Sequence, residues 1–130
     1  MKAEEMPKRA SFENFKSTMC HRVKNMGDID FMIDLIESDL IITLYDRGWY
    51  AECLYALGLL DYLSGINDVP ICSRYDKFRG MRLEKTIFPL GIIAISNVTG
   101  NDDAKNKALK EAIPEFMRFN IVEGNIRDVI

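Results

Sequence analysis

The chain has 130 residues, 48% of them hydrophobic and 28% charged, a composition typical of one globular domain with material for a single core. Its net charge of -3 argues against a protein that binds nucleic acid through its overall field, because neutralising phosphates requires concentrated lysine and arginine. Its three cysteines are odd in number and widely spaced, which argues against a disulfide framework or a CxxC ligand pair.

Residues 1–10 are charged and lack an apolar core behind the charges, so we expect a flexible tail and not a secretory signal. A single helical domain is expected over residues 11–130. Ser11 is placed to cap a first helix, whose apolar residues recur at three- and four-residue steps until Gly27. Reduced thiols and the missing signal together predict a cytoplasmic protein.

The middle of the chain predicts the centre of the fold. Asp28 can cap a second helix, which Ser38 restarts or bends before Gly48 ends it. The following segment, Trp49–Gly65, is apolar around most of its circumference. This pattern is typical of a helix that other helices surround, so we expect the segment to be the central helix.

The remaining elements are also predicted to be helical. A short helix is expected from Ser73 to about Met81. Pro89 fits the first turn of an apolar helix that closes near Gly100, although Ile92–Val98 is β-branched enough to form a short strand instead.

The C-terminal part predicts two more helical stretches. The acids at 102 and 103 favour a helix that runs to Ile113, where Pro114 interrupts it, and a last stretch is expected over Glu115–Ile130. The fold class is therefore all-α, a compact array of about six helices around Trp49–Gly65. No stretch is apolar and long enough for a membrane span, so no membrane contact is expected.

An acidic cluster marks the second predicted helix. Its five acids fall within twelve residues that contain no Lys or Arg: Asp28, Asp30, Asp34, Glu37 and Asp39. Three of them, Asp30, Asp34 and Glu37, share one helical face. The pattern fits a cation site, a docking surface or an acid–base couple, and it also fits a solvated face with two helix caps.

A basic and aromatic segment, residues 74–85, follows later. It holds Arg74, Lys77, Arg79, Arg82 and Lys85 against only Asp76 and Glu84, with Tyr75 and Phe78 between the cations. Cations interleaved with rings can hold a phosphate backbone and stack bases. In the alternative interpretation, both rings dock the short helix into the core, while the cations face water or the acidic second helix.

Asp61 stands near the C-terminal end of the most apolar helix, where the helix dipole disfavours negative charge, so we expect it to have a partner. Tyr62 and the arginines of 74–82 are the candidates for this pairing within the core. The enzymatic alternative is a carboxylic acid with a raised pKa that serves as a general acid beside Glu52, Tyr55 or Tyr62.

Other catalytic or metal-binding patterns are missing from the sequence. His21, its only histidine, directly follows Cys20, and neighbours on a helix point about 100° apart, so they cannot form a nucleophile–base pair on that basis. No nucleotide-binding, hydrolase or metalloprotease motif occurs. We therefore expect no catalytic residue, no metal and no cofactor.

At WYAECLYALGLLDYLSGINDVP and at AIPEFMRFNIVEGNIRDV, the sequence resembles a group of small, uncharacterised bacterial proteins. The resemblance implies an all-helical cytoplasmic protein, sometimes encoded near toxin–antitoxin-like genes, and it supplies no catalytic residues. Together with the missing motifs, it favours a non-enzymatic interaction or regulatory protein, with an antitoxin-like role as one form, whose partner is another protein or a second copy of itself. Nucleic-acid binding through 74–85 and a small enzyme built on Asp61 are the alternatives.

Overall fold

The computed structural model describes the backbone of residues 8–71 and 73–118, and within these it contains six α-helices, one 3-10 helix and no strand. The elements are α1 (Lys8–Met26), α2 (Asp28–Glu37), α3 (Leu40–Asp46), α4 (Tyr50–Ile66), η2 (Ser73–Phe78), α5 (Glu84–Thr99) and α6 (Asp102–Arg118). The predicted all-α array of about six helices is confirmed. No helix among the described residues is both long and apolar enough to span a bilayer.

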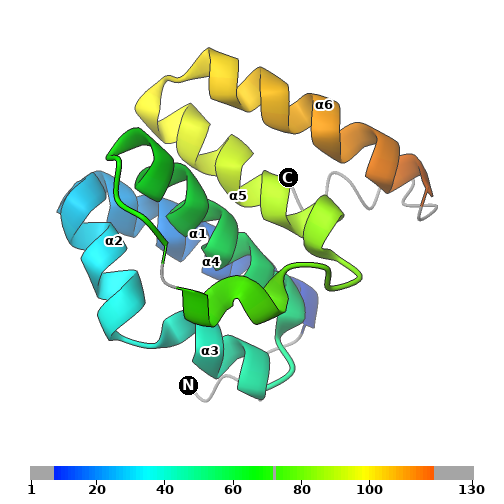
Figure 1. Ribbon diagram of the computed structural model, residues 1–130, viewed down its shortest axis with the longest axis horizontal. Helices are drawn as coiled ribbons and strands as arrows, with labels where there is room; N and C mark the ends of the chain where they lie inside the picture. Colours follow the sequence, from blue (N-terminus) through cyan, green and yellow to red (C-terminus); the bar gives the residue numbers. More distant parts are fainter. Residues whose placement is uncertain (1–7, 72, 119–130) are drawn as a thin grey trace.

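Helix α4 is the centre of this array, as predicted. Residues 52–60 are all buried, because the helix is apolar on nearly every side and each side meets another element. Helices α1, α2, α3 and α5 all pack against it. Figure 1 shows α6 along the outside of α5, so that α5 separates α6 from α4.

Helices α4 and α5 approach so closely that their backbones touch. A Cβ atom on Gly58 would lie 2.2 Å from the carbonyl oxygen of Phe88, and one on Gly91 would lie 2.4 Å from the carbonyl oxygen of Tyr55. Only glycine leaves room for such a crossing, because any side chain would collide with rigid backbone atoms of the other helix. These two glycines therefore fix the position of α5 on α4.

The first residues of helices α1 and α2 differ from the prediction. Helix α1 begins at Lys8, so residues 8–10, expected in the tail, are helical, and the cap expected at Ser11 lies inside the helix. Helix α2 has Gly27 as its N-cap, and Asp28 is its first helical residue. Asp28 still suits that place, because a carboxylate in the first turn interacts favourably with the helix dipole.

The expected helix over 73–81 is shorter and tighter than predicted. It is a 3-10 helix that ends at Phe78, because Gly80 takes a left-handed φ of 87° that no helix can continue through.

Helix α5 shows that the prediction at Pro89 was wrong. The helix begins at Glu84, so Pro89 lies inside it and not in its first turn, and the possible strand over Ile92–Val98 is helical. Proline removes only one backbone hydrogen bond, whereas the turn before it brings Thr86 and Ile87 into the core. Gly100 ends the helix with a φ of 77°, as predicted.

Helix α6 also contradicts the prediction at a proline. It runs through Pro114 to Arg118, where an end near Ile113 was expected. A proline inside a helix costs the hydrogen bond of its own nitrogen, and the turns on either side keep theirs. Residues 115–118 therefore belong to α6, and the rest of the stretch predicted over Glu115–Ile130 lies outside the described residues.

Candidate interaction surfaces

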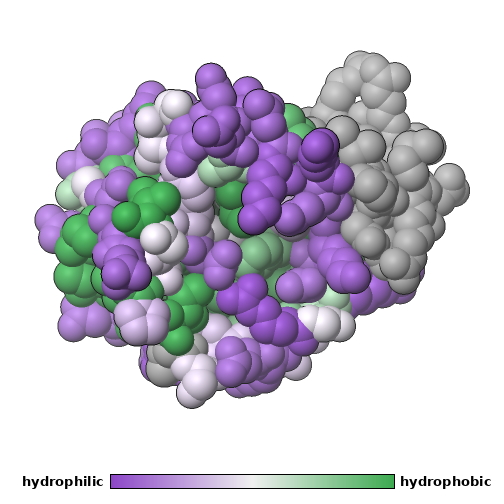
Figure 2. Space-filling model, turned by 45° about the horizontal axis from the view of Figure 1, so that its top comes forward, coloured by the Kyte–Doolittle hydropathy of each residue, from purple (hydrophilic) through white to green (hydrophobic). Residues whose placement is uncertain are grey.

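The outward side of α2 is formed by two isoleucines and two acids: Ile29, Asp30, Ile33 and Glu37. We call these four residues the outer face of α2. Ile29 is 44% exposed and Ile33 is 43% exposed, and Met26, just before the helix, is 37% exposed. Apolar surface gathers at the left of Figure 2, on the side where Figure 1 places α2 and the end of α4.

The acids of residues 28–39 divide into paired and unpaired groups. Asp34 forms an ion pair with Arg22 of α1, and Asp39 pairs with Arg74 at 2.5 Å. Asp30 and Glu37 have no such partner within the described part of the chain. The predicted acidic face therefore separates, because Asp34 turns toward α1 while Asp30 and Glu37 remain in solvent. Among the described residues, no group of acids, histidines and cysteines could hold a metal ion.

The two rings of the basic segment, residues 74–85, point into the core. Tyr75 and Phe78 both have an exposed fraction of 0%, and the Phe78 ring centroid lies 5.0 Å from that of Tyr45. The buried rings agree with the interpretation in which they dock the short helix into the core, and not with the one that placed them near nucleic-acid bases. The reason is the 3-10 geometry, in which residues three apart lie on the same side of the helix.

Three cations of the basic segment contact groups of the same chain. Arg74 donates to the carbonyl oxygen of Ile36 at 2.9 Å, in addition to its contact with Asp39. Lys77 lies over the rings of Tyr45 and Phe78, at 5.6 and 5.3 Å. Arg79 lies 4.8 Å from the ring centroid of Phe88, and Arg82 is exposed. These intramolecular contacts leave the segment a less effective phosphate-binding surface than its composition indicates.

Asp61 pairs with an arginine, as the sequence predicts, but the pair lies at the surface and not in the core. Arg79 donates to Asp61 Oδ1 at 3.2 Å, and the side chains remain 36% and 39% exposed. Tyr62 is buried and its hydroxyl lies 3.0 Å from that of Thr99, so it is not the partner of Asp61. The contact joins the middle of the basic segment to α4.

The residues of the enzymatic alternative do not converge. Asp61 faces Arg79, Tyr62 faces the end of α5, and the Tyr55 hydroxyl lies 3.9 Å from the Cys20 sulfur on α1. His21 is exposed and contacts Asn25, one turn along the same helix, at 2.9 Å. This arrangement brings no nucleophile and base together.

A cleft of about 330 Å³ between α1, α4 and α5 was not predicted. Its polar lining includes Lys16, which is 7% exposed, and Glu13, whose carboxylate lies 2.9 Å from the Lys16 nitrogen. The sequence does carry a signal, because Lys16 lies on the apolar stripe between Phe12 and Met19. Burial raises the pKa of the Tyr55 hydroxyl, which also lines the cleft. A protonated phenol beside an already paired lysine offers no activated nucleophile.

Two further buried groups lie on α4. Burial raises the pKa of the Glu52 carboxyl, and a hydrogen bond with its own backbone only partly offsets this effect. Burial also raises the pKa of the Cys53 thiol to about 12, so this cysteine is a protonated side chain of the core. Cys72 lies outside the described residues.

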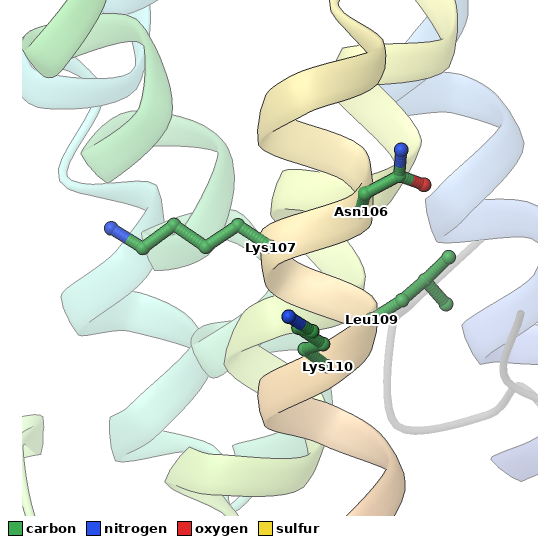
Figure 3. A pocket seen from close by; sticks show the side chains of 4 residues that line it. All are labelled: Asn106, Lys107, Leu109 and Lys110. Carbon is green, nitrogen blue, oxygen red and sulfur yellow. The ribbon is translucent and has the colours of Figure 1, made fainter.

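A larger hollow of about 510 Å³ lies beside α6, and its described lining is Asn106, Lys107, Leu109 and Lys110. Figure 3 shows the two lysines leaving the helix on a different side from Asn106 and Leu109. All four residues come from one helix, so they do not form a set of groups that face one another.

Comparison with known proteins identifies no relative, since no family model, curated protein or solved structure matches this chain. The functional interpretation therefore depends on the surfaces described above.

Proposed function

We propose that this protein is a non-enzymatic helical interaction module that binds another protein through the outer face of α2. The observation that carries the proposal is the pair of exposed isoleucines, one turn apart on a regular helix, beside acids that have no ion-pair partner among the described residues. Apolar side chains left together in solvent are typical of binding surfaces. A protein that covers part of its partner in this way would act as a regulator, in the antitoxin-like role expected from the sequence.

Nucleic-acid binding through residues 74–85 is the weaker proposal. Both rings are buried, and Arg74, Lys77 and Arg79 already make contacts within the chain. An enzyme built on Asp61 also has less support, because its candidate groups face three different elements.

Site-specific photo-crosslinking in the native host tests the proposal. A photoreactive phenylalanine analogue replaces Ile33 in one variant and Thr43, an exposed residue of α3, in the control. We expect one discrete protein adduct from position 33 and none from position 43, because the partner covers only the outer face of α2. The adduct, identified by mass spectrometry, should form again from the two purified proteins. Identical adduct patterns from both positions, or none from either, would contradict the proposal.

A further inference from the structure

We infer that the partner segment is a basic amphipathic helix of another protein, an inference that rests on the proposed function of α2. The partner places apolar side chains on Ile29 and Ile33, and it places lysine or arginine beside Asp30 and Glu37.

Charge complementarity determines the sign of the charge on the partner segment. Asp30 and Glu37 lie on the same helical stripe as Ile33, one toward each end of α2, and the outer face of α2 includes no cation. Two other acids of this region, Asp34 and Asp39, form ion pairs with Arg22 and Arg74 and are therefore neutralised within the chain. An acidic segment, a nucleic acid or an anionic membrane would be repelled from such a face, whereas a basic segment is attracted to it.

The shape of the surface favours a helix as the partner. The backbone of α2 is hydrogen-bonded within its own helix, so it offers no free strand edge to an extended peptide. The exposed stripe from Ile29 to Glu37 is about 12 Å long at 1.5 Å per residue, which matches two turns of a partner helix. Apolar residues spaced four apart on the partner would meet Ile29 and Ile33, also four apart.

A second copy of this chain fits the surface less well. Helix α6 exposes Lys107 and Lys110, but Leu109 leaves the helix on another side and is partly buried (Figure 3). The cations Arg74 and Arg79 already pair within the chain. The described residues therefore present no helix with both a free basic edge and an exposed apolar row. Because the described part of the chain offers no matching helix, the proposed partner is a different protein.

Nuclear magnetic resonance titration of the isotope-labelled full chain tests this inference with two designed 18-residue helical peptides. Both peptides carry the same leucine row, which lysines flank in one and glutamates in the other. We expect the lysine peptide to shift the amide signals of residues 26–37, with an affinity that falls as salt is added, and the glutamate peptide to have no effect. Because the surface is small, the dissociation constant should be on the order of 10–100 μM.

Charge reversal supplies the matched control. The variant Asp30→Lys with Glu37→Lys should bind the lysine peptide at least tenfold more weakly and should gain binding to the glutamate peptide. The variant Asp46→Lys with Glu111→Lys changes the net charge equally at two other exposed sites, and its affinity should stay within twofold of that of the unaltered chain. Equal losses in both variants would overturn the inference, because they would reflect only the overall field.

The remaining outcomes separate this inference from the proposed function. If neither peptide binds, or if the glutamate peptide binds better, the basic helix is excluded as the partner. An adduct from position 33 would then still support the interaction module. If position 33 gives no adduct, the proposed function falls, whatever the peptides do.

Discussion

The basic segment and the outer face of α2 look alike in the sequence, yet the fold uses them in opposite ways. Both mix charges with large apolar residues. In the basic segment, Tyr75 and Phe78 are completely buried and three of the cations contact groups of the same chain. On α2, Ile29 and Ile33 remain in solvent beside acids that form no ion pair with any described residue.

Periodicity, and not charge, accounts for this difference. Tyr75 and Phe78 are three residues apart in a 3-10 helix, so both rings enter the core together and draw the cations against the surface of the fold. On α2, Phe31, Met32 and Leu35 already fill the side that faces the core. The isoleucines at positions 29 and 33 lie on the other side and remain available to a partner. A charged run therefore indicates binding only when its apolar residues are not needed inside.

The largest expected effect tests this comparison directly. Phe78→Ala should destabilise the protein by about 3–5 kcal/mol, because it leaves a cavity beneath the basic segment. Ile33→Ala, at a 43% exposed position, should change stability by no more than about 0.5 kcal/mol. Urea denaturation of both variants gives the two values. Equal losses would mean that Ile33 is also a core residue and that the comparison is wrong.

The second prediction concerns the α4–α5 crossing at the centre of the fold. Gly58→Ala should cost about 2–3 kcal/mol, since its Cβ would lie 2.2 Å from a backbone oxygen that cannot move without displacing α5. Gly65→Ala, in the last turn of the same helix, has no atom within 4 Å and should stabilise the protein by up to about 1 kcal/mol. The midpoint of thermal unfolding should therefore fall for Gly58→Ala and rise for Gly65→Ala, although both replace glycine with alanine in α4. Shifts of the same sign would contradict the close backbone approach.

Much of the fold follows from local pattern, and the errors have a common physical cause. The central helix is predictable because its apolar residues cover every side. The partner of Asp61 is predictable because an acid near a helix C-terminus requires a cation. The helix start expected at Pro89 and the helix end expected at Pro114 are both wrong. The cost of one lost hydrogen bond is local, whereas the gain from packing a long helix comes from residues distant in the sequence.

The interaction surface on α2 could also be predicted only in part from the sequence. The acidic cluster is visible in the sequence, but its division into paired and unpaired acids depends on Arg22 and Arg74, which other elements supply. The burial of Lys16 and Glu52 likewise depends on neighbours from other helices. Periodicity predicts which side of a helix a residue occupies, and only the tertiary packing determines whether that side is covered.

The third prediction contrasts a buried acid with the exposed acids of α2. Burial raises the pKa of Glu52 in the folded protein above its ordinary value of 4.5. The folded state therefore binds the proton more tightly than the unfolded state, so this residue lowers stability as the pH rises from about 4.5 through the folded pKa. Glu52→Gln should remove that loss and be relatively more stable at pH 7 than at pH 4. Denaturation at both pH values measures the difference, and a constant difference would contradict a raised pKa.

The smallest expected effect asks whether charge, as distinct from ring burial, holds the basic segment in place. The Asp61–Arg79 contact is more than one third exposed on both sides, so solvent screens it, and a double-mutant cycle with Asp61→Asn and Arg79→Gln should give a coupling of about 0.5 kcal/mol. The coupling should fall further in 0.5 M salt. A coupling energy close to the stability loss of Phe78→Ala would contradict the conclusion that the buried rings hold the segment in place. A small value instead means that burial of Tyr75 and Phe78, and not the Asp61–Arg79 ion pair, holds the basic segment in place.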